Sequence, residues 1–362
     1  MDKQLIWMIK SAYKTPTRKV LSQLASEKDL FDESDIDTSS SEYKETVRNY
    51  YRAKEDGVEI VTYIDKEYPE ALKTISMPPR VLFVRGDKKA LMHKMYVGIV
   101  GSRKTDDYGM RMASSVAFEL GQTGVGVISG GAAGIDAAAH IGALRAKAKT
   151  IAVLGCGIDV TYPKTNAQLF ERIANEGGAV ITEFLYGESP RRENFPHRNR
   201  IIAALSASVI VVRASYKSGA LITANQAINM GKSVFAIPGN IDNSLSAGTN
   251  ALIRDGAGVL LSSMDIIDEL MLKNPDFFVM NTETESEEKQ IIEEKMDLQG
   301  LSAPEEEIVR LIREGKSSVE AMEQSVSFAP ARITAVLGML ELKGIIRRGF
   351  DKKYKFTSGG KC

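Results

Sequence analysis

Six short, almost uninterrupted apolar runs occur between residues 96 and 239, and amphipathic helical patterns separate them. They are YVGIV, VGVIS, TIAVLG, AVITE, SVIVV and SVFAIPG. A strand that is apolar on both faces belongs inside a sheet that helices cover on both sides. Strands that alternate with helices predict a parallel, doubly wound sheet. We therefore expect residues 61–274 to form a Rossmann-like α/β domain.

The segments on either side differ in composition and in the spacing of their apolar residues. Residues 1–60 carry apolar side chains at helical spacing and predict a small helical module. Residues 275–300 are rich in glutamate and predict an exposed acidic linker. Residues 301–358 predict three helices followed by a hairpin, which is the plan of a winged-helix domain. Its third helix offers few base-reading side chains, so we expect an accessory role for this domain.

Composition excludes several classes of protein. The 362 residues include 47 Lys and Arg against 47 Asp and Glu, so any surface for nucleic acid must be local. Cys156 and Cys362 lie far apart, which argues against a disulfide framework and against a zinc site. No uncharged apolar stretch is long enough to span a bilayer. We expect a soluble, cytoplasmic protein without a membrane partner, a metal or a cofactor.

The turns that follow the predicted strands gather glycines, hydroxyls and cations. The carboxyl ends of parallel strands meet at one edge of a sheet, where such folds bind ligands. A glycine turn that opens a helix also directs backbone N–H groups at phosphate. The candidate binding residues at this edge are Gly101, Ser102, Arg103, Ser129, Gly130, Gly131, Gly134, Arg198, Asn199, Arg200, Lys217, Ser218 and Gly219.

The segment between Arg191 and Lys217 concentrates positive charge. It holds six cations that Glu193 alone opposes, and this patch suits several phosphates in a row better than one nucleotide. Nucleotide fingerprints are missing: the Gly130 turn is not G-x-G-x-x-G, and two G-K-S triplets lack the first glycine of a P-loop. The alternative that Gly130 and Gly131 only form a tight turn stays open.

Other polar residues near these turns favour structural roles. We expect Asp136 and Asp159 to cap or brace turns, and Cys156 and His140 to be packed residues. His197 sits inside the basic segment, and the sequence leaves its role open.

The ordered series GSR, SGGAAGIDAAAH, GCGIDVTYP, FPHRNRIIAALS, SGALITA, VFAIPGN and GTNALIRDGA resembles the DNA-processing protein A family, also called DprA or Smf. The resemblance implies a bacterial protein that binds single-stranded DNA, forms a homodimer and helps to load the recombinase RecA during natural transformation and recombination. It also implies a sterile-alpha-motif-like (SAM-like) N-terminal module and no established enzymatic activity. It places Arg103, Arg198, Arg200 and the Lys217 turn around the DNA strand. Arg213 stands where the family usually has glutamate.

Two rival functions remain open. One is a phosphoribohydrolase-type enzyme, although Leu252 occupies the position where that signature requires glutamate. The other is a nucleotide-sensing scaffold that signals through its winged helix. One apolar set after residue 259 can be interpreted in two ways, as a surface for self-association or as part of the domain's own core. Its members are Leu260, Leu261, Ile266, Ile267 and Leu270.

Overall fold

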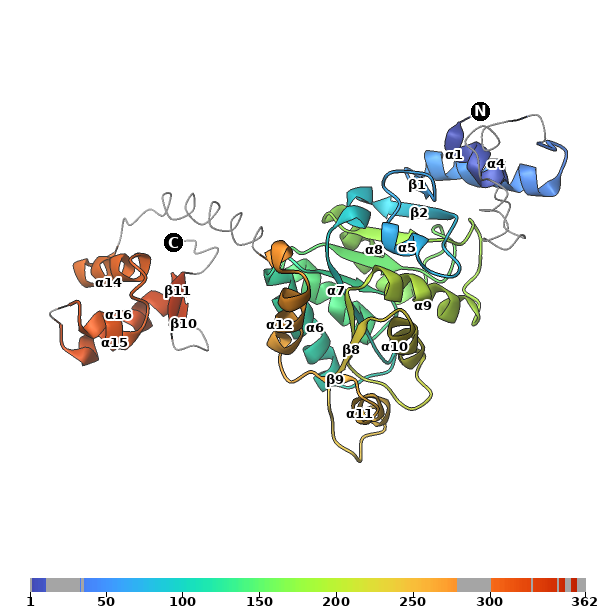
Figure 1. Ribbon diagram of the computed structural model, residues 1–362. Coiled ribbons are helices and arrows are strands. Elements are labelled where there is room, and N and C mark those ends of the chain that lie inside the picture. The colour runs from blue at the N-terminus through green and yellow to red at the C-terminus, as the bar shows by residue number, and fades with distance from the viewer. Residues whose placement is uncertain are drawn as a thin grey trace. The chain divides into compact units, whose positions relative to one another are not determined.

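The computed structural model describes residues 2–10, 33, 36–278, 301–326, 328–343, 345–348 and 353–356. The chain divides into two compact units, Met1–Glu283 and Thr284–Cys362 (Figure 1). The finer boundaries at residues 60, 274 and 300 remain predictions. Residues 279–300, most of the expected acidic linker, lie outside the described residues.

A nine-stranded sheet forms the centre of the first unit, in the order β1-β2-β6-β5-β4-β3-β7-β8-β9. The six apolar runs are confirmed as its inner strands: β3 (Tyr96–Val100), β4 (Gly126–Ser129), β5 (Thr150–Val153), β6 (Ala179–Thr182), β7 (Ser208–Val211) and β8 (Ser233–Ala236). They run parallel to one another. The sheet also has edge strands that the pattern did not single out: antiparallel β1 (Glu59–Thr62) and β2 (Val81–Gly86), and parallel β9 (Gly258–Val259).

The order of the strands places a switch point beside β3. The chain adds β4, β5 and β6 on one side of β3 and then returns to add β7, β8 and β9 on the other side. The loops that follow β3 and β7 therefore leave the sheet in opposite directions, and a crevice opens between them.

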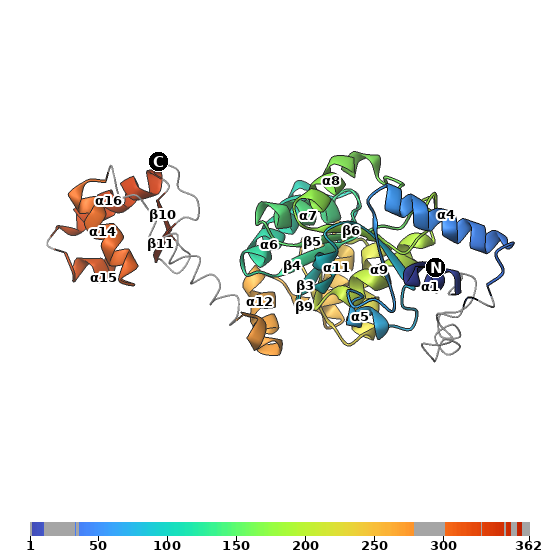
Figure 2. The same cartoon turned by 90° about the horizontal axis from the view of Figure 1, so that it is seen from above.

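Helices cover both faces of the sheet (Figures 1 and 2). One face packs against α6 (Asp107–Gln122), α7 (Ile135–Arg145) and α12 (Ser263–Lys273). The other packs against α5 (Glu70–Lys73), α9 (Asn194–Leu205) and α10 (Gly219–Asn229). α8 (Ala167–Asn175) packs against β2 and β6 and belongs to the same hydrophobic cluster as the N-terminal helices described below. α11 (Ala247–Arg254) contacts β8. The strands are buried on both faces, which explains their uninterrupted apolar sequences.

The two N-terminal helices, α1 (Lys3–Lys10) and α4 (Ser41–Glu55), pack at the β1 edge of the sheet. Trp7 is buried, stacks on Tyr63, and donates its indole N–H to the carbonyl of Arg80 at 2.9 Å. Ser40 caps the start of α4 by accepting from the N–H of Tyr43. These helices share a core with Phe83 of β2, so they are anchored to the α/β domain.

The second unit contains α14 (Ala303–Arg313), α15 (Val319–Glu323) and α16 (Pro330–Leu342), followed by antiparallel β10 (Ile346–Arg348) and β11 (Tyr354–Phe356). This is the predicted order of three helices and a hairpin, and the hairpin turn lies outside the described residues. Lys343 at the end of α16 binds the carboxylate of Glu305 at 2.8 Å, and this hydrogen bond is the main reason that the pKa of Glu305 falls to about 2. No helix in the described ranges is long and apolar enough to cross a membrane.

Candidate functional site

A cavity of about 570 Å³ opens at the switch point, where the loops after β3 and β7 meet the start of α9. Of the predicted binding residues, those that line it are Gly101, Ser102, Arg103, Arg198, Asn199, Lys217, Ser218 and Gly219. The fold therefore brings together residues from three segments that are far apart in the sequence. Arg192 also lines this cavity, which we call the switch-point cavity.

Three cations of the switch-point cavity are exposed: Arg103, Arg192 and Lys217. Within the described part of the chain, no carboxylate lies at ion-pair distance from any of them. The ion pairs of this region are made by Arg191, Arg200 and Arg213 instead. Beside Lys217, Ser218 caps α10 by accepting from the N–H of Ala220. The positive end of α10 therefore adds to the attraction that this cavity exerts on anions.

An aromatic pair lines the same cavity. The rings of Tyr162 and Phe195 lie 5.7 Å apart between centroids, and the guanidinium of Arg103 lies over the Phe195 ring at 4.6 Å. Tyr162 is 38% exposed, so its ring is accessible to a ligand. This pair was not predicted from the sequence, although each ring lies in a quoted segment, GCGIDVTYP or FPHRNRIIAALS. An aromatic residue within a basic or glycine-rich strand-end loop was the available signal.

Polar groups of the glycine turn after β4 form hydrogen bonds within the protein. Ser129 is buried and donates its hydroxyl to the carbonyl of Ile99 at 2.6 Å. The N–H groups of Gly130 and Ala132 donate to one oxygen of Asp136, at 3.1 and 3.4 Å. Because Asp136 occupies these donors, they are not presented to a ligand, and the tight-turn interpretation of this segment is the better one.

Two further glycines of this turn serve packing. Gly131 has φ +65°, the carbonyl of Gly131 accepts from Asn166 at 3.0 Å, and a side chain at Gly131 would collide with Phe170. Gly134 has φ +84°, and a side chain there would collide with the backbone of Ser102 and Arg103. Its close approach joins the β4 turn to the β3 loop.

Arg198 forms part of the cavity floor and is only 4% exposed. Its guanidinium donates to the carbonyl of Gly130 at 2.7 Å and so braces the glycine turn. Burial lowers the pKa of Arg198 to about 10, and the nearby charge of Asp136 opposes this shift. Burial likewise raises the pKa of Asp136, against the effect of Arg198. Asn199 donates to the carbonyl of Gly219 at 3.4 Å and links α9 to the start of α10.

Arg200 does not line the switch-point cavity. Both of its terminal nitrogens bind the carboxylate of Glu183, one of them at 2.6 Å, and its Nε donates to the carbonyl of Met77 at 3.0 Å. Burial alone would raise the pKa of Glu183, but hydrogen bonds from His197 and Arg200 hold it below its usual value. Arg200 is therefore a bracing residue, and His197 belongs to the same cluster, 3.6 Å from Glu183.

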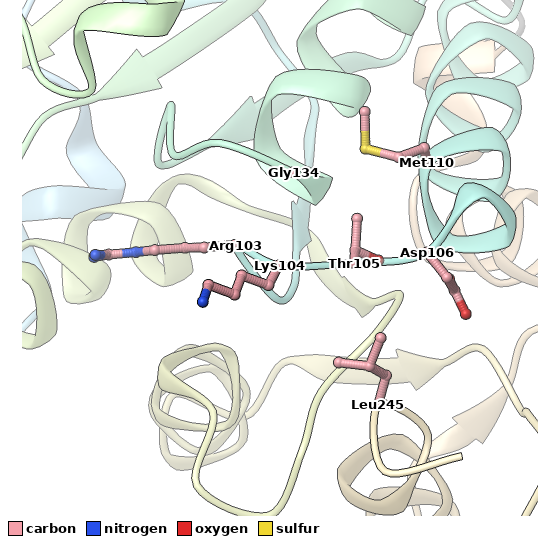
Figure 3. A pocket seen from close by; sticks show the side chains of 7 residues that line it. All are labelled: Arg103, Lys104, Thr105, Asp106, Met110, Gly134 and Leu245. Atoms are coloured by element: carbon pink, nitrogen blue, oxygen red, sulfur yellow. The ribbon is translucent and has the colours of Figure 1, made fainter.

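A second cavity, of about 590 Å³, lies beside Arg103 and is lined by Arg103, Lys104, Thr105, Asp106, Met110, Gly134 and Leu245. Figure 3 shows that Arg103 and Lys104 extend from one loop, while Met110 and Leu245 enter the space from other elements. The two cavities share Arg103 in their linings.

Arg213 joins the loops that frame this second cavity. It is 4% exposed, binds the carboxylate of Asp106 at 3.0 and 3.2 Å, and donates to the hydroxyl of Ser246 at 2.6 Å. Its charge is therefore balanced by Asp106, which also caps α6.

The other titratable residues near the sheet are structural. Cys156 is buried, and burial raises the pKa of its thiol to about 11. His140 binds the hydroxyl of Thr150 at 2.8 Å, and burial lowers its pKa to about 3. Among the described residues, no cluster of His, Cys, Asp and Glu side chains is arranged to hold a metal ion.

The sequence of this chain is similar to those of known proteins. Residues 59–271 match the model of the family described as DNA recombination-mediator protein A. The chain is 38% identical over 224 residues to the DNA processing protein DprA of Bacillus subtilis, a match that covers 62% of this chain and 75% of that protein. It is 44% identical over 215 residues to the protein Smf of Synechocystis, which covers 59% of this chain and 54% of that protein.

Solved structures agree with the sequence matches. The structure of DNA processing protein A from Streptococcus pneumoniae aligns with a TM-score of 0.62 at 33% identity, over 74% of this chain and 98% of that one. A structure that addresses the single-stranded DNA binding mode of DNA processing protein A from Helicobacter pylori aligns with a TM-score of 0.54 at 31% identity. It covers 59% of this chain and 97% of the other.

Proposed function

Because the chain belongs to the DNA recombination-mediator protein A family, we propose that it binds single-stranded DNA at the switch-point cavity and acts in DNA uptake and recombination in the cytoplasm. The observation that carries this proposal is the combination of exposed cations with the exposed ring of Tyr162 and the partly buried ring of Phe195 in one cavity at the carboxyl edge of the sheet. The Helicobacter pylori relative, whose single-stranded DNA binding has been described, supports the same ligand.

The cations supply contacts to the phosphate backbone. Arg103, Arg192 and Lys217 are exposed, so each can bind a phosphate without first breaking an ion pair. Guanidinium and ammonium groups on phosphate position a strand but read no sequence. Binding at this site is therefore expected to be tolerant of sequence and strongly dependent on salt.

The aromatic pair supplies a surface for bases. The Tyr162 ring is accessible, and Phe195 is already stacked beneath Arg103. Stacking requires a base that is not paired within a duplex, and it suits every base because each has a π face. This feature favours single strands over duplexes.

The same geometry favours binding over nucleotide hydrolysis. Leu252, at the position where a phosphoribohydrolase signature places glutamate, is an aliphatic side chain packed against the core. Asp136, the acidic residue of the cavity lining, is occupied by the turn that it braces. We therefore propose that the chain acts as a binding protein and not as an enzyme.

Self-association is part of the proposal. Of the five apolar residues considered earlier, Leu260, Ile266, Ile267 and Leu270 are buried in their own domain, so the dimer surface cannot be built on them. The exposed apolar side chains of this region are Val259, Leu261, Met264, Met271 and Leu272. We propose that this set, the α12 patch, forms the homodimer contact. Met264→Glu should shift sedimentation toward monomer, whereas the control Ile228→Glu on α10 should leave it unchanged.

We also propose that the DNA-bound protein helps to load RecA, as its family membership implies. An order-of-addition assay of RecA filament formation on single strands coated with single-strand-binding protein tests this role. The protein should shorten the lag before filament growth, and Lys217→Ala should restore part of the lag. An unchanged lag with the wild-type protein would contradict the loading role while leaving DNA binding intact.

The decisive binding experiment compares three ligands at several salt concentrations. A labelled oligothymidine should bind more tightly than a duplex of equal length, and a mononucleotide should compete weakly. Each phosphate contact should contribute about 0.7 to the log–log salt slope for single strands. Tight mononucleotide binding with a slope near zero would instead support the nucleotide-sensing alternative.

A further inference from the structure

Helix α4 of the N-terminal segment contributes no residue to the lining of the switch-point cavity. Two of its polar side chains nevertheless contact the loops that carry one wall of that cavity. These loops are residues 154–163, after β5, and residues 183–193, after β6. They supply Tyr162, Pro190 and Arg192 to the cavity lining.

Asn49 makes the first contact. Its side chain is on a residue that is only 1% exposed, and its oxygen accepts the backbone N–H of Tyr186 at 2.7 Å. Its amide nitrogen donates to the carbonyl of Glu45 at 2.7 Å within α4. Because both ends of the amide are used, its orientation is fixed, and it holds the β6 loop at a defined position on α4.

Arg52 makes the second contact, one helical turn further along. It binds the carboxylate of Asp159 at 3.0 Å and lies over the Tyr186 ring at 4.8 Å. Asp159 in turn accepts the N–H of Gly187 at 2.9 Å. Arg52 therefore holds both loops at once, through Asp159 on one and Tyr186 on the other.

The two loops are also bound to each other. The N–H of Gly157 donates to the carbonyl of Glu188 at 2.9 Å, and the hydroxyl of Thr182, the last residue of β6, donates to the carbonyl of Cys156 at 2.8 Å. A shift of either loop against α4 would therefore move both, and with them the ring of Tyr162 and the cation of Arg192.

We propose that Asn49 and Arg52 are positioning residues for single-stranded DNA, which act by holding the Tyr162 and Arg192 wall of the switch-point cavity in place. This inference rests on the proposed function of that cavity. It assigns the N-terminal helix a part in DNA affinity without any contact to DNA.

The test measures salt-dependent binding of a labelled oligothymidine to the full chain carrying Asn49→Ala or Arg52→Ala, each alone and combined with Arg192→Ala. Alone, each variant should weaken binding about threefold to tenfold. Each should also lower the salt slope by up to about 0.7, the value of one phosphate contact. In the Arg192→Ala background the further loss of slope should disappear, because the contact that α4 positions is already gone.

Controls separate positioning from stability. Arg48→Ala removes an exposed arginine from the same helix and should leave affinity and slope unchanged. Arg52→Lys keeps a cation for Asp159 and should recover much of the affinity. Arg52 is half exposed, so its variants remain informative even if Asn49→Ala fails to fold.

Two results would overturn the positioning role: a lower melting temperature with wild-type affinity and slope, or a loss of salt slope that simply adds to that of Arg192→Ala. If the wild-type chain binds single strands and Lys217→Ala weakens that binding, such results remove this inference alone. A folded wild-type chain that does not bind single strands removes the proposed function as well.

Discussion

The cations at the carboxyl edge of the sheet form two groups that the sequence does not distinguish. Arg198, Arg200 and Arg213 are buried, and each is bound to carbonyl, carboxylate or hydroxyl groups of the protein. Arg103, Arg192 and Lys217 are exposed and line the switch-point cavity. The difference is that the buried cations are already bound to polar groups of the protein, whereas the exposed ones form no ion pair within the described residues and remain available to a ligand.

The buried group still serves the site indirectly. Arg198 supports the β4 turn, Arg200 fixes α9 to the β6 loop, and Arg213 joins the β3 and β8 loops. Substitutions in this group should therefore lower stability first, whereas substitutions in the exposed group should lower DNA affinity and leave stability nearly unchanged. The following predictions test that division.

The largest effect is expected for Arg200→Ala. It leaves the carboxylate of Glu183 buried without its main partner, and the loss of one member of a buried ion pair costs about 3–5 kcal/mol of unfolding free energy. Urea denaturation measures this loss. Arg192→Ala, the matched exposed variant, should change the unfolding free energy by less than about 0.5 kcal/mol. Similar small losses for both variants would contradict the division into buried and exposed cations.

The next effect concerns the aromatic wall. Phe195→Ala should weaken oligothymidine binding by about 1–3 kcal/mol, because a stacked base loses its platform. The salt slope should stay the same, since no phosphate contact is removed. Phe195→Leu controls for packing against Gly155. An Ala variant with full affinity would show that bases do not stack at this wall.

Between pH 6.5 and pH 5, a smaller effect is expected from His140 in the buried layer. Burial, assisted by the charge of Arg198, lowers the pKa of His140 from 6.5 to about 3, so the folded protein keeps this ring neutral while the unfolded chain takes up a proton. Its contribution to stability is therefore complete above pH 6.5 and declines as the pH falls toward 3. The slope is about 1.4 kcal/mol per pH unit.

Denaturant unfolding of His140→Gln measures this contribution. The wild type should lose more stability than the variant between pH 6.5 and pH 5. Parallel stability curves for the two proteins would mean that His140 is protonated in the folded state as readily as in the unfolded chain.

The strand pattern predicted the centre of the fold and the edge at which the cavity opens. Each inner strand is buried on both faces, and continuous apolar runs report that directly. The edge strands were missed because β1 and β2 pair antiparallel outside the repeating strand-helix pattern, and β9 has only two residues. Asp136 braces its turn as expected, since its partners are local in sequence.

The parts of the site that escaped prediction depend on distant partners. Glu183 neutralises Arg200, Asp106 neutralises Arg213, and Tyr162 meets Phe195 only after the chain has folded. Likewise, the burial of Leu270 follows from how α12 packs on α6, which periodicity alone does not reveal. Charge and apolar counts along the sequence cannot separate these residues from exposed ones.

The most direct test of the account is the salt dependence of oligothymidine binding by a variant that combines Arg103→Ala, Arg192→Ala and Lys217→Ala. Three lost phosphate contacts should reduce the log–log slope by about 2 relative to wild type, while urea denaturation shows nearly unchanged stability. A stable triple variant that keeps the wild-type slope and affinity would contradict the assignment of single-stranded DNA to the switch-point cavity.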